Sequence, residues 1–110
     1  VMAIPHASPG QPIDVRPLGS DLSTRRTTAL FKSDDLEVMR LVLAAGQSLP
    51  PHKVPGDITI HCLEGRLQVD TPAGASTLEA GQLLYLRGGD VHGVAALADA
   101  SALVTIALKG

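Results

Sequence analysis

Aromatic residues are almost missing from this sequence of 110 residues, which has no Trp, one Tyr and one Phe. Hydrophobic residues still make up 45% of the chain, so its core has to be built from Leu, Val, Ile and Ala. We therefore expect no large pocket walled by aromatic rings. Because few rings are present for bases to stack on, and Arg25-Arg26 is the one basic doublet, we expect no nucleic-acid partner.

Cysteine, net charge and long apolar runs are also scarce. The single cysteine, Cys62, rules out a disulfide framework within the chain and favours a reducing compartment, so we expect the cytoplasm. A formal net charge of -2 with 18% charged residues is typical of a globular domain. No apolar run approaches the roughly 18 residues that span a bilayer. Residues 1–5 also lack the basic and apolar regions of a signal peptide, so we expect no membrane partner.

Glycine and proline are abundant, with 11 and 8 residues, and they divide the chain into short segments. Such segments leave no room for several helices and are typical of an all-β protein. The length fits one domain over residues 1–110, in which residues 1–12 are expected to form an extended arm. Because a domain of this size buries a limited apolar surface, its stability is modest. We therefore expect a homodimer formed through an apolar face.

Alternating apolar residues predict eight or nine short strands, which favours a sandwich or a small barrel. The expected strands cover residues 27–31, 36–44, 58–63, 67–71, 76–79, 83–86, 92–97 and 103–108, with a helical turn as an alternative within 95–103. In the second of these, Arg40 indicates that its row of side chains faces water.

Two connections are also predicted from local residue types. Residues 46–56 are expected to form a loop, in which Pro50 and Pro51 hold the backbone extended and prevent helical pairing. The turn at Glu64-Gly65 is expected to join residues 58–63 and 67–71 as a hairpin, because Gly accepts the positive φ of such turns.

Residues 46–65 resemble the first of two sequence motifs of the cupin family. That motif runs Gly, five residues, His, one residue, His, three or four residues, Glu, six residues, Gly. Gly46, His52 and Gly65 match the motif. Val54 stands at the second His position and Ile58 at the Glu position, so two of its three metal ligands are missing.

Residues 81–96 resemble the second cupin motif, which runs Gly, five residues, Pro, one residue, Gly, two residues, His, three residues, Asn. Gly81, Gly89 and His92 match it, whereas Arg87 replaces the Pro and Ala96 the Asn. The two motifs and the segment between them span residues 46–96, about half of the chain. The resemblance implies the RmlC-like cupin fold, a double-stranded β-helix or jelly-roll barrel.

The resemblance also implies where a metal would bind. Metal-dependent cupins use three histidines and a carboxylate that face into the barrel, a set that suits one divalent transition metal. Only His52 and His92 carry over, which implies a metal held weakly by these two residues, or none. The same pair are the candidate catalytic residues, as general acid and base for a small ligand. The third alternative is that both are loop-end histidines with no site.

Four more residues are expected to contact a small-molecule ligand at the barrel mouth. Val54 and Ile58 would make the cavity narrow and apolar. Arg87 would pair with an anionic group, or remain a solvated loop residue. Tyr85 would cap the pocket with its hydroxyl group, or pack in the core.

Four neighbouring residues are expected to have other roles. Strand alternation turns His61 to the outer face, and Asp57 outward as well unless a bulge intervenes. Cys62 is expected to pack rather than to act as a nucleophile. Asp90 would orient His92.

Fold does not fix activity, so the functional hypothesis stays broad. The leading hypothesis is a small single-domain cupin that binds a small organic ligand in its barrel, with a divalent metal weakly held or absent at His52 and His92. The alternatives are a metal-dependent cupin enzyme of the oxygenase, isomerase or lyase type, and a non-catalytic ligand sensor.

Overall fold

The computed structural model describes residues 7–108, so residues 1–6 of the expected N-terminal arm lie outside it. The described chain consists of β-strands and one short 3-10 helix, which confirms the all-β prediction. In order, the elements are η1 (Gly19–Thr24), β1 (Thr28–Lys32), β2 (Leu36–Leu43), β3 (Ser48–His52), β4 (Ile58–Glu64), β5 (Arg66–Thr71), β6 (Gly74–Glu79), β7 (Leu83–Leu86), β8 (His92–Ala96) and β9 (Ala100–Ala107). Within residues 7–108, no helix is long and apolar enough to cross a bilayer.

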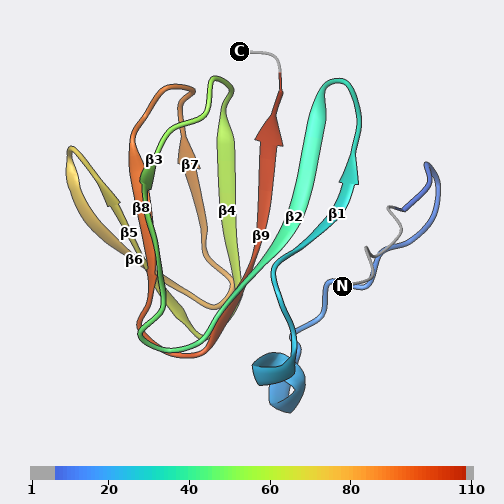
Figure 1. Cartoon of the computed structure of the whole chain (residues 1–110), viewed down its shortest axis with the longest axis horizontal. Helices are drawn as coiled ribbons and strands as arrows, with labels where there is room; N and C mark the ends of the chain where they lie inside the picture. The colour runs from blue at the N-terminus through green and yellow to red at the C-terminus, as the bar shows by residue number, and fades with distance from the viewer. Residues whose placement is uncertain (1–6, 109–110) are drawn as a thin grey trace.

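The strands form two antiparallel sheets that face each other (Figure 1). The five-stranded sheet has the order β1-β2-β9-β4-β7, and the four-stranded sheet has the order β3-β8-β5-β6. Most consecutive strands lie in different sheets, so the chain crosses repeatedly from one layer to the other. This is the jelly-roll arrangement. The β3–β4 and β7–β8 loops meet at one end of the sheets, and η1 lies at the other end (Figure 1).

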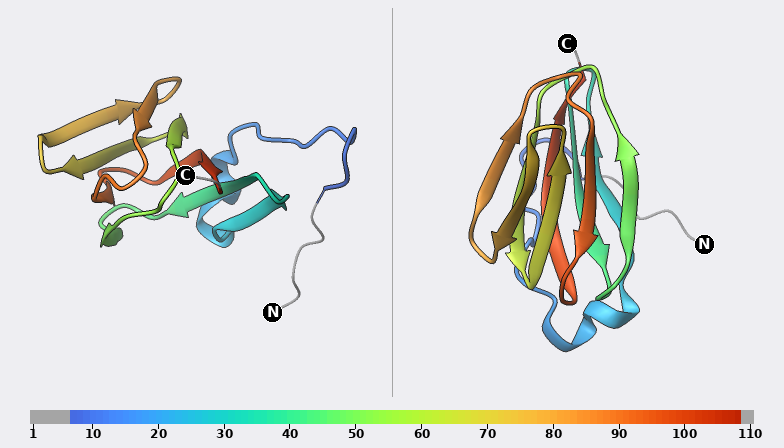
Figure 2. Two further views of the ribbon diagram at one scale, coloured as in Figure 1. Left: turned by 90° about the horizontal axis from the view of Figure 1, so that it is seen from above. Right: turned by 90° about the vertical axis from the view of Figure 1, so that its left-hand side faces the viewer.

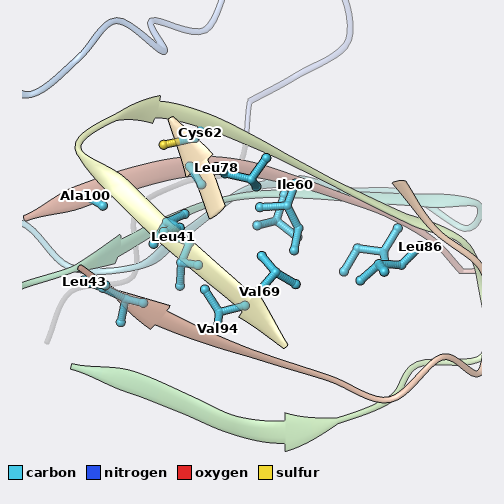
Figure 3. Close-up of a cluster of buried hydrophobic side chains, with 14 residues drawn as sticks. Leu41, Leu43, Ile60, Cys62, Val69, Leu78, Leu86, Val94 and Ala100 are labelled. Atoms are coloured by element: carbon cyan, nitrogen blue, oxygen red, sulfur yellow. The ribbon is translucent and has the colours of Figure 1, made fainter. Parts of the chain in front are cut away.

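An aliphatic core occupies the space between the two sheets (Figure 3). Alternation along each strand sends every second side chain inward, as in Ile58, Ile60 and Cys62 of β4. The buried cluster contains no aromatic ring, as the composition predicts. Its members are Leu41, Leu43, Ile58, Ile60, Cys62, Leu67, Val69, Leu78, Leu86, Val94, Ala96, Ala100, Ala102 and Val104.

The loop predicted over residues 46–56 is wrong in its middle, where β3 pairs with β8. Pro50 and Pro51 are tolerated because β3 is the edge strand of its sheet, where one row of backbone groups needs no partner. The register shifts between Leu49 and His52, so the prolines lie at a bulge in the ladder.

The predicted hairpin of residues 58–63 with 67–71 is also wrong, because β4 and β5 belong to different sheets. β4 pairs with β7 and β9, whereas β5 pairs with β6 and β8. Gly65 makes the sharp crossing between the layers with a φ of 76°. A Cβ atom there would lie 2.0 Å from the carbonyl oxygen of Asp99, so the close approach requires glycine.

The helical turn considered within residues 95–103 does not form, since residues 97–99 are a bend between β8 and β9. The short helix lies instead at η1, in a part of the chain for which no helix was predicted. Residues 14–24, which include η1, are named here the N-terminal segment. Figure 2 shows it outside the two layers of strands.

The N-terminal segment covers part of the outer face of the five-stranded sheet, and this corrects the expectation for Arg40. That side chain points away from the core, as predicted, but it is only 7% exposed. Its Nη2 donates to the carbonyl oxygen of Asp14 at 3.4 Å. Glu64, at the end of β4, accepts hydrogen bonds from the backbone N–H groups of Leu18 and Gly19 at 2.8 and 2.9 Å.

Candidate functional site

His52 and His92 come together at the end of the sheets where the β3–β4 and β7–β8 loops meet. The two residues are register partners in the β3–β8 ladder, and their ring centroids lie 4.5 Å apart. On β8, His92 shares the inner face with Val94 and Ala96, which belong to the core. Because the bulge skips one residue of β3, His52 faces the same side as Leu49, which packs against the core.

Each histidine ring is held by a backbone carbonyl two residues before it. The Nδ1 atom of His92 lies 3.1 Å from the oxygen of Asp90, and the Nδ1 atom of His52 lies 3.3 Å from the oxygen of Pro50. A carbonyl oxygen only accepts hydrogen bonds, so each Nδ1 carries the proton and donates. In the neutral form of both rings, the proton-free nitrogen is therefore Nε2.

The two rings differ in their exposure. His52 is exposed, whereas His92 is only 2% exposed. Among residues 7–108, no buried side-chain nitrogen or oxygen lacks a hydrogen-bond partner. Within the same residues, the hydrogen bond of His92 is the one at Nδ1, and no partner is found for its Nε2. Neither Nε2 atom is thus engaged by another of the described residues.

The loops around the pair are fastened to each other by hydrogen bonds. The N–H of Gly89 donates to the oxygen of Val54 at 2.8 Å, and the N–H of Gly88 donates to Oδ1 of Asp57 at 2.8 Å. Gly88 also lies so close to Pro55 that an added Cβ would be 2.1 Å from its carbonyl oxygen. These contacts hold the β3–β4 and β7–β8 loops together beside the two histidines.

The four expected ligand-contact residues do not all face the histidine pair. Ile58 is 4% exposed and belongs to the core, and Val54 is half-buried in the β3–β4 loop. Arg87 is exposed in the β7–β8 loop, where its N–H donates to Oδ2 of Asp90 at 3.1 Å. Tyr85 is 59% exposed on the outer face of β7, because Leu84 and Leu86 take the inner positions. Of the two roles expected for Tyr85, packing in the core is wrong.

Other candidate ligands lie away from the pair or are already engaged. The carboxylate of Asp57 accepts from Gly88 and, at 3.5 Å, from the hydroxyl of Tyr85. Cys62 is fully buried in the core, and its thiol donates to the oxygen of Glu64 at 3.4 Å. Burial raises the pKa of this thiol, which disfavours the nucleophilic thiolate.

The described residues do not fit a resident catalytic metal. No group of three or more His, Cys, Asp or Glu side chains within residues 7–108 is placed to hold a metal ion. Catalytic metal sites usually have three protein ligands in fixed positions, and the histidine pair supplies two. A metal at this site would need donors from water or from a ligand.

The backbone contacts of the site were missed from the sequence, although part of the signal was present. The Pro50-Pro51 pair directly before His52 marks an interrupted ladder, and this could have indicated the bulge. Asp90 is expected to orient His92, and it contacts the ring through its carbonyl oxygen, while its carboxylate accepts from the N–H of Arg87 in the loop.

Comparisons with known proteins agree with this architecture. Solved structures with the same fold include an RmlC-like cupin from Desulfovibrio desulfuricans, with a TM-score of 0.76 and 24% identity over 91% of this chain and 99% of that one. A conserved protein of Streptococcus pyogenes gives a TM-score of 0.75 and 19% identity over 100% of this chain and 96% of that one. A cupin superfamily protein of Desulfitobacterium hafniense gives a TM-score of 0.74 and 20% identity over 88% of this chain and 94% of that one.

At these identities the structural likeness concerns the fold alone. Among curated proteins, no sequence matches this chain. The family profile described as the cupin domain matches residues 39–108, which is more than half of the sequence and includes both histidines. The chain therefore belongs to the cupin family.

Proposed function

We propose that this cupin binds a small organic molecule at the end of the barrel where His52 and His92 meet, without a resident metal. The observation that carries the proposal is the arrangement of the two rings. Their ring centroids lie 4.5 Å apart, and each Nδ1 donates to a carbonyl oxygen. Both Nε2 atoms are therefore left to accept a hydrogen bond from a ligand. Two fixed nitrogen acceptors at the edge of an apolar core form a small polar site of the kind that orients a ligand.

The chemistry of the pair suggests the class of ligand. A neutral imidazole accepts a hydrogen bond at the nitrogen that carries no proton, so the ligand would have a hydroxyl or another N–H or O–H donor. Ile58 and Leu86 are register partners on the inner face at the same end, and they favour an aliphatic or small aromatic body. Transfer of the ligand proton to Nε2 would make the pair a general base, which is the enzymatic form of this proposal.

A binding experiment with a matched control tests this function. The probe is a set of small neutral alcohols and phenols, screened by saturation-transfer NMR. We expect binding to the wild-type protein and to Lys32→Gln, because Lys32 is exposed at the end of β1 and away from both the histidine pair and the outer face of β4, and loss of binding in His52→Gln. His52 is exposed, so its replacement leaves the core unchanged. Equal binding by both variants, or no binding to the wild-type protein, would contradict the proposal.

The alternative of a metal-dependent enzyme has less support, because the histidine pair offers two ligands and metal enzymes commonly use three. Elemental analysis distinguishes the two. We expect Ni²⁺, Mn²⁺ or Zn²⁺ added to the protein to be lost on desalting. One equivalent of metal retained by the wild-type protein, and lost in His52→Gln, would favour the metal-dependent enzyme.

We also propose that the partner of this chain is a second copy, bound through the outer face of β4, β7 and β9. Leu83 and Tyr85 are 63% and 59% exposed there, next to the half-buried Leu103 and His61. The outward positions of these strands carry no Lys, Arg, Asp or Glu between residues 59–61, 83–85 and 101–107. Two copies of such an uncharged patch can therefore meet about a twofold axis without burying like charges.

Light scattering after size-exclusion chromatography measures this association. We expect the mass of a dimer for the wild-type protein and of a monomer for Leu83→Glu. The control is Leu97→Glu, because Leu97 is 48% exposed but lies in the bend between β8 and β9. A monomeric wild-type protein, or the same mass for both variants, would exclude this interface.

A further inference from the structure

We propose a second binding site, for a small organic carboxylate, in a groove beside η1 at the opposite end of the molecule from His52 and His92. The groove has a volume of about 350 Å³, which lies at the lower end of the range for small-molecule sites. Its walls come from the C-terminal end of η1, the stretch that leads into β1, and the end of β2. It is independent of the histidine pair and of the function proposed for it.

The charge of the groove favours an anion. Arg25 and Arg26 line it, and no acidic residue does. Among residues 7–108, the ion pairs are Asp14–Arg16 and Arg66–Glu79, so neither Arg25 nor Arg26 is neutralised by a carboxylate. A guanidinium group matches the planar geometry of a carboxylate and can donate two hydrogen bonds to it.

The remaining lining is mixed, with Ser23, Thr27 and Gln47 beside three apolar residues, and its apolar part suits an organic anion. Leu22, Val42 and Ala44 supply apolar surface beside the two arginines. Leu22 is only 5% exposed, so the half-buried Val42 and Ala44 present most of this apolar surface. An aliphatic chain against this surface would be removed from water, which would add to the binding free energy. Inorganic phosphate has no apolar part and cannot gain this contribution.

The arginine-bearing stretch is fixed at both ends, so the groove exists before a ligand arrives. The N–H of Arg25 donates to the oxygen of Leu22 at 3.1 Å. After Arg26, the hydroxyl of Thr27 accepts from the N–H of Val42 at 3.0 Å and donates to its oxygen at 3.4 Å. Such prior ordering lowers the entropy cost of binding.

The carboxylate of Glu64 holds η1, and with it this wall of the groove, against the five-stranded sheet. It accepts from the N–H groups of Leu18 and Gly19, directly before and at the start of η1, and from the hydroxyl of Ser101. These hydrogen bonds join η1 to β4 and β9 of the five-stranded sheet. Glu64 is therefore a positioning residue for the groove, which acts through η1 and does not touch the ligand.

Titration of the full chain with hexanoate, followed by ¹⁵N–¹H NMR, tests the proposal. We expect saturable shifts of the Thr27, Val42, Ala44 and Gln47 amide signals that weaken as salt is added. The double variant Arg25→Gln/Arg26→Gln should bind about tenfold more weakly or less, because two charge-assisted contacts are lost. Lys32→Gln, which removes an exposed cation from the end of β1, should titrate like the wild-type protein.

Other probes and variants supply the outcomes that would overturn the proposal. Hexan-1-ol has the same hydrocarbon chain without the charge, and equal shifts of these four signals by hexan-1-ol would show that the arginines are not used. Binding of inorganic phosphate without binding of hexanoate would contradict the proposal, because the site would then take phosphate and not an organic carboxylate. Unsaturable shifts, or unchanged affinity in the double variant, would exclude the site. His52→Gln should leave the hexanoate titration unchanged, which separates this test from that of the histidine pair.

Discussion

Glu64 and Ser101 are register partners on β4 and β9, and their side chains form a hydrogen bond next to the N-terminal segment. Ser101 is only 1% exposed, and the same carboxylate accepts from the backbone of Leu18 and Gly19. One side chain thus connects the β-sheet to a segment of the chain about 45 residues away in sequence. These hydrogen bonds hold the start of η1, and the residues that carry Arg25 and Arg26 follow directly after this helix.

Replacing Glu64 by Ala should destabilise the fold. The change leaves the hydroxyl of Ser101 and two N–H groups without their acceptor, which should lower the free energy of unfolding by about 1–3 kcal/mol. Urea unfolding measures the loss, and faster hydrogen exchange at Leu18 and Gly19 would locate it. The control is Glu79→Ala, because the Arg66–Glu79 pair is more than half exposed and should contribute about 1 kcal/mol or less. Similar losses in both variants would contradict the anchoring role.

The same carboxylate should make stability fall at acid pH. Burial alone raises the pKa of Glu64, but hydrogen bonds from Leu18, Ser101 and Gly19 and the charge of Arg40 outweigh it and bring the pKa below its ordinary value of 4.5. A group with a lowered pKa in the folded state stabilises that state above its unfolded pKa. The stabilisation is lost as the pH falls through the folded pKa.

Urea unfolding of the wild-type protein and of Glu64→Gln, compared from about pH 6 down to about pH 3, measures this contribution. We expect a smaller loss of stability in the variant, because its side chain does not titrate. Asp14, whose pKa is lowered to about 2 by Arg16, is present in both proteins and does not contribute to the difference. Parallel curves for the two proteins would assign the acid sensitivity to other groups.

The strands were largely predictable from the sequence because their alternation is local. β2, β4 and β7 begin at the residues that the pattern predicts, and Cys62 lies in the core as expected. Pairing was harder to predict, since it depends on contacts between distant segments. The Glu64-Gly65 turn reads as a hairpin in isolation, but β9 occupies the place beside β4 that β5 would have taken. The alternation also predicts that the side chain of Arg40 is exposed to water. It does not reveal that the N-terminal segment covers that part of the outer face.

The site was predictable only in part. His52 and His92 were found through their spacing in the cupin motifs, and the structure brings them together as β3–β8 partners. The carbonyl groups that hold their rings could not be identified from residue types, because every residue has a carbonyl. The groove at Arg25 and Arg26 was missed because its other side comes from β2, which only the position of η1 brings close.

Restoring the second motif histidine should create a site that retains metal. Val54 stands at that position and is half-buried in a loop, so Val54→His should be tolerated and would add a third imidazole near His52 and His92. We expect the variant to keep about one equivalent of Ni²⁺ after desalting, because three protein ligands suffice where two do not. Lys53→His adds a histidine at the adjacent exposed position and should keep no more metal than the wild-type protein. Equal retention by the two variants would mean that the loop does not present residue 54 to the pair.

Gly65→Ala should be among the most destabilising single methyl additions in the chain. Its φ of 76° is unfavourable for an L side chain, and the added Cβ would lie 2.0 Å from the oxygen of Asp99. We expect a loss of about 3 kcal/mol or more, from strain combined with the collision between backbones. Gly81→Ala separates the two causes, because Gly81 has a similar φ of 89° but no atom within 4 Å of an added Cβ. This control should lose only about 1–2 kcal/mol from conformational strain. Urea unfolding of both variants measures the difference, and equal losses would show that β4 and β5 can separate from the β8–β9 bend at little cost.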